Sequence, residues 1–330
     1  MKILVTGIAG FIGFHVAKHL ATLGHDIVGL DNLNDYYDPF LKKSRLRELG
    51  IRADQGTKNK NERKIFYQLD ITDADALEKV FDEHQFDAIC HLAAQAGVRY
   101  SIENPRAYID SNLVGFFNVL DQCRLYNIPK LVYASSSSVY GSREDAKFSE
   151  TDITDSPESL YAATKKSNEL MASAYSKVYG MDVTGLRFFT VYGPWGRPDM
   201  APMLFTKAII AGEAIKVFNH GNVQRDFTYI DDIVEGIIRV LLDPIHRCES
   251  RVFNIGCSQP VSVLNFIKIL EKRIGKSANM KMFPKQVGDV ISTFADVSLL
   301  AKTYNYQPSI DLEKGINSFI DWYKHFYSNQ

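Results

Sequence analysis

A tyrosine and a lysine lie four residues apart in the stretch Tyr161-Ala-Ala-Thr-Lys165. The stretch opens a predicted helix over 162–179, in which residues four apart share one face. A free tyrosine has a pKa of about 10, and one ammonium at ~4 Å supplies about 4 kcal/mol, enough to lower that pKa by ~3. Burial opposes this shift, so a second positive charge should be needed as well. The pair predicts a phenol that acts as a general base.

Four consecutive serines, 135–138, follow a predicted strand over 130–135 and precede Val139-Tyr140-Gly141. Open α/β sheets bind ligands at the carboxyl ends of their strands. Packing does not readily explain four hydroxyl groups at such a place. The run is therefore predicted to line a ligand site.

Three evenly spaced glycines, Gly7, Gly10 and Gly13, follow a predicted strand over 2–6 and extend into the start of a predicted helix over 11–23. Glycines let the backbone approach a pyrophosphate, and a helix N-terminus offers free N–H groups and a positive dipole end. The arrangement predicts a dinucleotide site.

The second predicted strand ends at Asp31-Asn32. A carboxylate at this place can accept both ribose hydroxyls and would repel a 2′-phosphate, which favours NAD over NADP. Asp70 and Ile71, at the end of the third predicted strand, are expected beside the adenine.

Short apolar runs alternate with amphipathic helical runs through the first half of the chain. This alternation predicts a doubly wound α/β fold, with a parallel sheet and helices on both faces. The polar segment 35–64 breaks the rhythm and is interpreted as a surface insertion, with a helix over 39–49 and a solvated loop. From about residue 190, repeated prolines indicate a second, smaller region. The expected strands are 2–6, 26–30, 65–70, 88–92, 130–135 and 182–188, and the expected helices include 11–23, 74–83, 113–126 and 162–179.

The composition gives no sign of a nucleic-acid or membrane partner, because the net charge of the 330 residues is −1 and no apolar run reaches the length of about 20 residues that crosses a bilayer. The four cysteines form no CxxC pair and suit a reducing compartment, so a cytoplasmic protein is expected. His15 and His19 lie four apart without a third ligand, and no metal is expected.

The glycine loop, the Ser-Ser-x-x-Val-Tyr-Gly stretch and the Tyr-x-x-x-Lys pair resemble, in this order, the extended short-chain dehydrogenase/reductases. Within them the sequence is similar to the nucleotide-sugar epimerases over nearly its whole length. The resemblance implies that Tyr161 is the base and later the acid, and that Lys165 is its electrostatic partner and ribose anchor. Aligned on Val139-Tyr140-Gly141, it places the catalytic hydroxyl, a proton relay, on Ser136.

The residues just before Val139 narrow the reaction. Related sugar 4,6-dehydratases carry Asp-Glu where this chain has Ser137 and Ser138, and decarboxylases carry Glu in the second place. Without an added acid or base, the remaining path is oxidation at carbon 4, rotation of the 4-keto sugar and return of the hydride. NAD is then regenerated in each turnover and is expected to stay tightly bound.

Three stretches, 31–37, 91–99 and 187–197, resemble the UDP-glucuronate 4-epimerase branch. Glucose-type epimerases carry asparagine in place of Thr190. The resemblance implies that Arg197 and Thr190 bind the sugar carboxylate, with Arg99 as a second candidate. In the alternative interpretation, these arginines pair with acidic loop residues.

The remaining expectations also follow from the resemblance. Arg225 is expected at the diphosphate, Val217 and Phe218 beside the uracil, and Asp289 at a ribose hydroxyl, although Gln286 and Val287 depart from the Arg-Pro of glucose-type enzymes. A homodimer is expected, paired through helices that carry Phe116, Leu120, Leu170, Met171 and Ala174. Further residues expected to bind the cofactor are Phe11, Ile12, Leu92, Ala93, Ala94, Asn112, Ser135 and Phe188, and Ser137 and Ser138 are expected to contact the substrate.

Residues 1–189, with a returning segment of about 227–256, are expected to form the NAD-binding domain, and 190–226 with 257–330 the nucleotide-sugar-binding domain. The favoured reaction is conversion of UDP-glucuronate to UDP-galacturonate. A UDP-glucose/galactose 4-epimerase, a UDP-glucuronate decarboxylase and a non-enzymatic NAD-sensing protein stay open as alternatives.

Overall fold

The larger lobe is built on one sheet, ordered β11-β7-β6-β5-β1-β2-β4-β3. The computed structural model describes residues 1–52, 58–61, 63–142, 147–285, 290 and 292–328. Every neighbouring pair in this sheet is parallel except the edge pair of β3 and β4, which confirms the doubly wound α/β fold. The strands are β1 Lys2–Thr6, β2 Asp26–Asp31, β3 Lys58–Asn61, β4 Lys64–Gln68, β5 Ala88–His91, β6 Leu131–Ser136, β7 Val183–Phe188 and β11 Ser250–Ile255.

Both faces of this sheet are covered, because neighbouring residues of each strand point to opposite sides. In β1, Ile3 and Val5 belong to one apolar core and Leu4 to the other. The first core includes α1 and α9, and the second includes α3, α6 and α7. These helices are α1 Phe11–Thr22, α3 Ala74–Glu83, α6 Gly115–Leu125, α7 Leu160–Tyr179 and α9 Ile230–Leu241.

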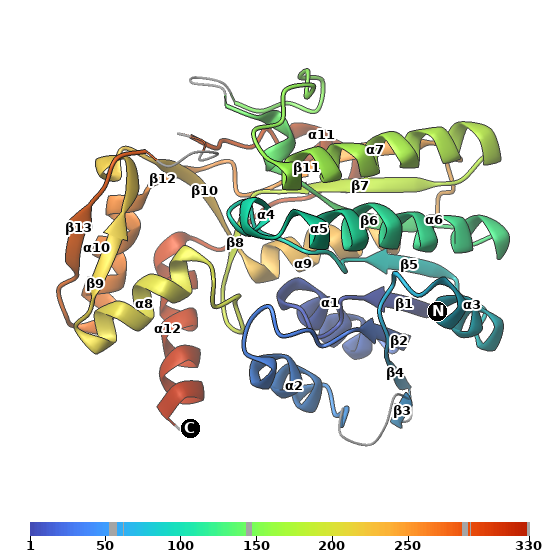
Figure 1. Cartoon of the computed structure of the whole chain (residues 1–330), viewed down its shortest axis with the longest axis horizontal. Coiled ribbons are helices and arrows are strands. Elements are labelled where there is room, and N and C mark those ends of the chain that lie inside the picture. The colour runs from blue at the N-terminus through green and yellow to red at the C-terminus, as the bar shows by residue number, and fades with distance from the viewer. Residues whose placement is uncertain (53–57, 62, 143–146, 286–289, 291, 329–330) are drawn as a thin grey trace.

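A smaller lobe lies beside the sheet, on the left in Figure 1, and the C-terminal helix α12 runs along the junction. Its strands form two small sheets, ordered β12-β10-β8 and β13-β9. No helix in the described part of the chain is both long and apolar enough to cross a bilayer. The elements are β8 Thr190–Tyr192, α8 Ala201–Ala211, β9 Ala214–Val217, β10 Gln224–Tyr229, β12 Pro260–Ser262, α10 Val263–Ile274, β13 Asn279–Met282, α11 Ser298–Tyr304 and α12 Leu312–Ser328.

The expected division into two domains stays a prediction. The returning segment 227–256 does contribute the strand β11 to the main sheet and the helix α9 to the layer that covers it. However, β10 pairs with β8 and β12 in the smaller lobe, and α11 packs against β11 and α9.

The interpretation of segment 35–64 as a surface insertion is wrong for its helix, α2 (Pro39–Glu48). Leu41 and Leu46 are buried, and Arg45 has no exposed surface. A helix that buries one apolar face and an arginine is part of the packed structure. The interpretation fails because it treats the polar residues of the segment as surface residues, and Arg45 is a buried one.

The Arg45 guanidinium joins three segments of the chain. Its Nη1 donates to the Ala9 carbonyl oxygen at 2.8 Å and to the Tyr37 hydroxyl at 2.7 Å. Its Nη2 donates to the carbonyl oxygens of Trp195 at 2.6 Å and Gly196 at 3.3 Å. The glycine loop and the loop before α8 are therefore linked through α2.

Replacing Arg45 with lysine is expected to lower the free energy of unfolding by about 2–3 kcal/mol, because one ammonium leaves several buried acceptors unsatisfied. Chemical denaturation of the purified variant measures the change. Arg63→Lys is the control, since Arg63 is mostly exposed and makes a surface ion pair. Equal effects of the two variants would contradict the role assigned to Arg45.

Candidate active site

A cavity of about 1200 Å³ opens between the carboxyl ends of the main strands and the smaller lobe. Single-ligand sites usually measure about 300–1,000 Å³, so this one has room for two bound molecules. The residues expected to bind cofactor or substrate line it, with Asn112 as the exception among the described ones. Asp289, Gln286 and Val287 lie outside the described residues.

The glycine loop is closed so tightly that side chains have no room in it. A Cβ atom on Gly13 would lie 2.1 Å from the Gly7 carbonyl oxygen, and one on Gly7 would lie 2.8 Å from the Ala93 nitrogen. Gly7 also has a φ of +71°, which favours glycine. Because α1 begins at Phe11, within the glycine run, its free N–H groups are available to an anion in the cavity.

Asp31 lies at the end of β2 and faces this loop. Its Oδ2 accepts from the Ala9 nitrogen at 3.1 Å and its Oδ1 from the Leu33 nitrogen at 2.9 Å. Each carboxylate oxygen has a second lone pair, so both can still accept a ribose hydroxyl. The Asn32 amide donates to Asp70 Oδ2 at 2.7 Å, which brings the two predicted adenosine contacts together.

Asn112 does not have the position expected of a cofactor contact. Its Oδ1 accepts from the Gln95 nitrogen at 2.8 Å, and its Nδ2 donates to the Gln95 carbonyl oxygen at 3.0 Å. The same Nδ2 donates to Thr164 Oγ1 at 3.1 Å. Asn112 therefore lies behind the cavity wall and holds the backbone of Gln95 in place.

Tyr161 lies in the first turn of α7, close enough to Ser136 at the end of β6 for that hydroxyl to favour the ionised phenol. Burial raises the pKa of Tyr161, and this effect outweighs the hydrogen bond with Ser136 and the positive charge of Arg197. The Ser138 hydroxyl donates to Ser136 Oγ at 2.9 Å. The hydroxyl proton of Ser136 thus remains available for Tyr161, as a proton relay requires.

Lys165 follows one turn later and is almost fully buried. Its Nζ donates to the Ala134 carbonyl oxygen at 2.8 Å. Burial lowers the pKa of Lys165 to about 8. In the protein alone, burial therefore shifts both Tyr161 and Lys165 toward their neutral forms, and the phenol needs more positive charge than Lys165 supplies.

The serine run is held from behind by a buried network. Ser135 Oγ donates to Glu169 Oε1 at 2.7 Å, and Glu169 receives two hydrogen bonds of 2.8 Å from Arg187. Arg187 Nη1 also donates to the Tyr140 hydroxyl at 2.8 Å. Both partners of the ion pair are buried, so the network anchors the end of β6 to α7 and β7.

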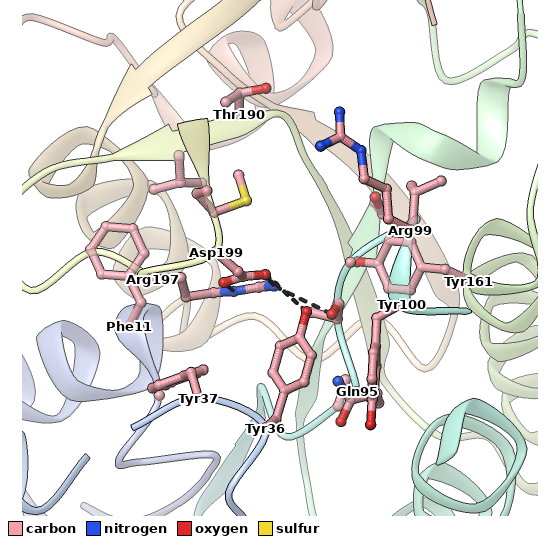
Figure 2. A pocket seen from close by; sticks show the side chains of 18 of the residues that line it. Phe11, Tyr36, Tyr37, Gln95, Arg99, Tyr100, Tyr161, Thr190, Arg197 and Asp199 are labelled. Carbon is pink, nitrogen blue, oxygen red and sulfur yellow. Dashed lines mark hydrogen bonds and ion pairs between the residues drawn. The ribbon is translucent and has the colours of Figure 1, made fainter. Parts of the chain in front are cut away.

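The two arginines proposed for a sugar carboxylate lie on the cavity wall with Thr190, the first residue of β8 (Figure 2). Arg197 is paired with Asp199, as the alternative interpretation expects: its Nε donates to Asp199 Oδ1 at 3.0 Å. The guanidinium of Arg99 lies 4.9 Å from the ring centroid of Phe218.

Several cavity residues were not predicted. They come from the segment before α2 and from α2 itself, from the residues that follow β5, and from the loop before α8. The runs 31–37 and 91–99 carry only a resemblance that assigns no role to these residues, and Asp199 lies just beyond the stretch 187–197. The residues are Asn34, Tyr36, Tyr37, Lys42, Gln95, Tyr100 and Asp199.

Comparison with known proteins gives consistent similarities. Residues 3–256 match the model described as the NAD dependent epimerase/dehydratase family. Protein CapI of Staphylococcus aureus is 48% identical over 342 residues, which cover 99% of each chain. UDP-glucuronate 4-epimerase 4 of Arabidopsis thaliana is 46% identical, over 99% of this chain and 76% of its own. The crystal structure of UDP-glucuronic acid 4-epimerase from Bacillus cereus, in complex with UDP-glucuronic acid and NAD, is similar with a TM-score of 0.91 and 34% identity, over 99% of this chain and 100% of that chain.

Replacing Gly13 with alanine is expected to abolish retention of the dinucleotide, because the new Cβ would collide with the Gly7 carbonyl oxygen. Nucleotide released from the denatured protein, measured by absorbance and chromatography, tests this. Gly275→Ala is the control: Gly275 ends α10 with a φ of +81° in open space. That change should cost about 1 kcal/mol of stability and leave the nucleotide content intact. Full retention in Gly13→Ala would contradict the assignment of the loop.

Proposed function

The chain belongs to the NAD dependent epimerase/dehydratase family, and from this we propose that it converts UDP-glucuronate to UDP-galacturonate by inverting carbon 4. The resemblance to the nucleotide-sugar epimerase branch is confirmed, because the similar proteins include UDP-glucuronate 4-epimerases. The observation that carries the proposal is the meeting of Tyr161, Ser136 and Arg197 at one cavity beside the glycine loop.

NAD suits the cofactor half of the cavity. The glycine loop is shaped to approach a pyrophosphate, and Asp31 can accept the ribose hydroxyls and repel a 2′-phosphate. When bound, NAD takes up a hydride from carbon 4 and returns it to the opposite face of the 4-keto sugar. Lys165 is our choice for the residue that anchors the nicotinamide ribose.

Tyr161 removes the proton of the 4-hydroxyl while the carbon–hydrogen bond at carbon 4 breaks, so a ketone forms there. Ser136 donates to the phenolate oxygen and orients it. After the sugar has rotated, Tyr161 returns the proton to the new hydroxyl. The reaction leaves cofactor and base as they began.

The carboxylate on carbon 5 sets a second requirement. A 4-keto glucuronate is a β-keto acid, which loses carbon dioxide when its C–CO2 bond stands perpendicular to the ketone plane. Thr190 and Arg197 are our choice for the groups that hold this bond out of alignment, with Arg99 as a further contact. Val217, Phe218 and Arg225, which line the part of the cavity formed by the smaller lobe, suit the uridine diphosphate, and Asp289 stays our choice for a ribose hydroxyl.

We also propose a cytoplasmic homodimer. The four cysteines are free, which suits a reducing compartment. On α6 and α7, Phe117, Leu170 and Val178 are exposed and suit a second copy of the chain. Phe116 and Leu120, expected at such an interface, are instead buried within the subunit.

Incubation with UDP-glucuronate and no added NAD is expected to yield UDP-galacturonate, because the cofactor is regenerated in each turnover. Tyr161→Phe keeps the ring and removes the base, so turnover should fall by about a hundredfold or more. Chromatography of the products measures both. A pentose nucleotide as main product, or no product at all, would refute the proposed reaction.

Arg197→Ala and Thr190→Ala are each expected to weaken binding of UDP-glucuronate and to release a pentose nucleotide beside the epimer. Loss of a charge-assisted contact costs about 1.5–3 kcal/mol, which is roughly ten- to a hundredfold in KM. Mass spectrometry of the products detects the pentose. If neither variant releases pentose or binds more weakly, the carboxylate contact is misassigned.

A further inference from the structure

We infer that Tyr36 is a positioning residue for the reaction: it orients Arg197 through Asp199, so that the arginine meets the substrate carboxylate already ordered. The inference rests on the proposed function, since it concerns the carboxylate of that substrate. It also gives a role to the segment before α2. Residues 31–37 resemble the UDP-glucuronate 4-epimerase branch, but this resemblance does not say what the residues do.

The contacts form a chain of three side chains (Figure 2). The Tyr36 hydroxyl donates to Asp199 Oδ2 at 3.0 Å. Arg197 donates from Nε to Oδ1 at 3.0 Å and from Nη2 to Oδ2 at 2.5 Å. Its Nη2 also donates to the Ala96 carbonyl oxygen at 3.3 Å. One edge of the guanidinium is thus occupied, and Nη1 has no hydrogen-bond partner among the described residues.

The charges keep the direction of these hydrogen bonds constant. Burial and the neighbouring Asp199 raise the pKa of Tyr36 to about 12, so its hydroxyl stays a donor. Burial by itself would raise the pKa of Asp199, but the charge and hydrogen bond of Arg197 outweigh it and lower that pKa. At neutral pH the carboxylate is therefore ionised between two donors.

Tyr36 itself is held by hydrogen bonds within its own segment. The Leu33 nitrogen donates to Asp31 Oδ1 at 2.9 Å, and the Tyr36 nitrogen donates to Asn34 Oδ1 at 3.4 Å. Lys42 Nζ donates to the Asn34 carbonyl oxygen at 2.8 Å. The position of the phenol is thereby fixed relative to Asp31, the carboxylate that faces the cofactor ribose.

The backbone next to the Tyr36 hydroxyl and Arg197 leaves these two side chains little room to move. Gly97 has a φ of +110°, and a Cβ on it would lie 3.1 Å from the Tyr36 hydroxyl and 3.5 Å from Arg197 Nη2. Trp195, two residues before Arg197, has a φ of +62°, and its carbonyl oxygen accepts from Arg45. A strained backbone held by a buried arginine fixes the start of the loop that carries Arg197.

The expected consequence is preorganisation. If the Tyr36 hydroxyl is removed, Asp199 loses one of its two side-chain donors, and the pair with Arg197 can take more than one arrangement. The substrate must then order the arginine as it binds, which weakens binding by about three- to tenfold. Ligands without the carboxylate should not be affected.

Tyr36→Phe tests this in the full chain with its cofactor. The KM for UDP-glucuronate should rise about three- to tenfold, whereas the inhibition constant of UDP and the NAD content should stay unchanged. A merely structural role would change these values together. Tyr126→Phe is the matched control, because Tyr126 also donates its hydroxyl to an aspartate, Asp82, on the surface; it should change none of these values.

A second experiment uses a protein that lacks the charged pair, and it tests whether Tyr36 acts through Asp199 and Arg197. With both Arg197→Ala and Asp199→Ala present, adding Tyr36→Phe should change the KM no further. The inference is wrong if Tyr36→Phe leaves the KM unchanged, if it raises the UDP inhibition constant in parallel, or if it has its full effect without the charged pair. The proposed function fails separately, if the unaltered protein makes no UDP-galacturonate.

Discussion

Burial of a phenol and an ammonium one helical turn apart is the constraint on which the rest of the site depends. Burial raises the pKa of Tyr161 and lowers that of Lys165 to about 8, so each group moves toward its neutral form. Ionising Tyr161 then requires additional positive charge in the cavity. Arg197 supplies some from the sugar side, and NAD supplies more when it is bound. Tyr161 is therefore ionised more readily when NAD is bound than in the protein alone.

The fold builds the cavity around Tyr161 and Lys165 by bringing distant segments of the chain to one edge of the main sheet. The carboxyl ends of β1, β2 and β6 place the glycine loop, Asp31 and Ser136 around the cavity, and the smaller lobe adds Thr190 and Arg225. The helix α2 connects the two halves, because Arg45 contacts both the glycine loop and the loop that leads to Arg197. The cofactor side and the sugar side are thus parts of one packed structure.

Local spacing predicted the parts of the site that depend on local structure. The glycine loop, the Tyr161–Lys165 pair and the strand ends all follow from periodicity over a few residues. Tyr36 and Asp199 were missed because their contact joins residues 163 positions apart, and nothing in either segment signals the other. Resemblance placed Asn112 at the cofactor, but its amide groups are used to hold Gln95. Helical periodicity likewise does not distinguish Phe116, buried in the core of the subunit, from exposed Leu170 on the neighbouring helix.

The central claim is that a hydride leaves carbon 4 and returns to the same carbon, while the proton on oxygen passes through Tyr161. The most direct measurement uses UDP-glucuronate that carries deuterium at carbon 4, converted in ordinary water, with the UDP-galacturonate analysed by mass spectrometry and NMR. We expect the deuterium to remain on carbon 4 of the product, now on the opposite face. Replacement of that deuterium by hydrogen from water would contradict the mechanism.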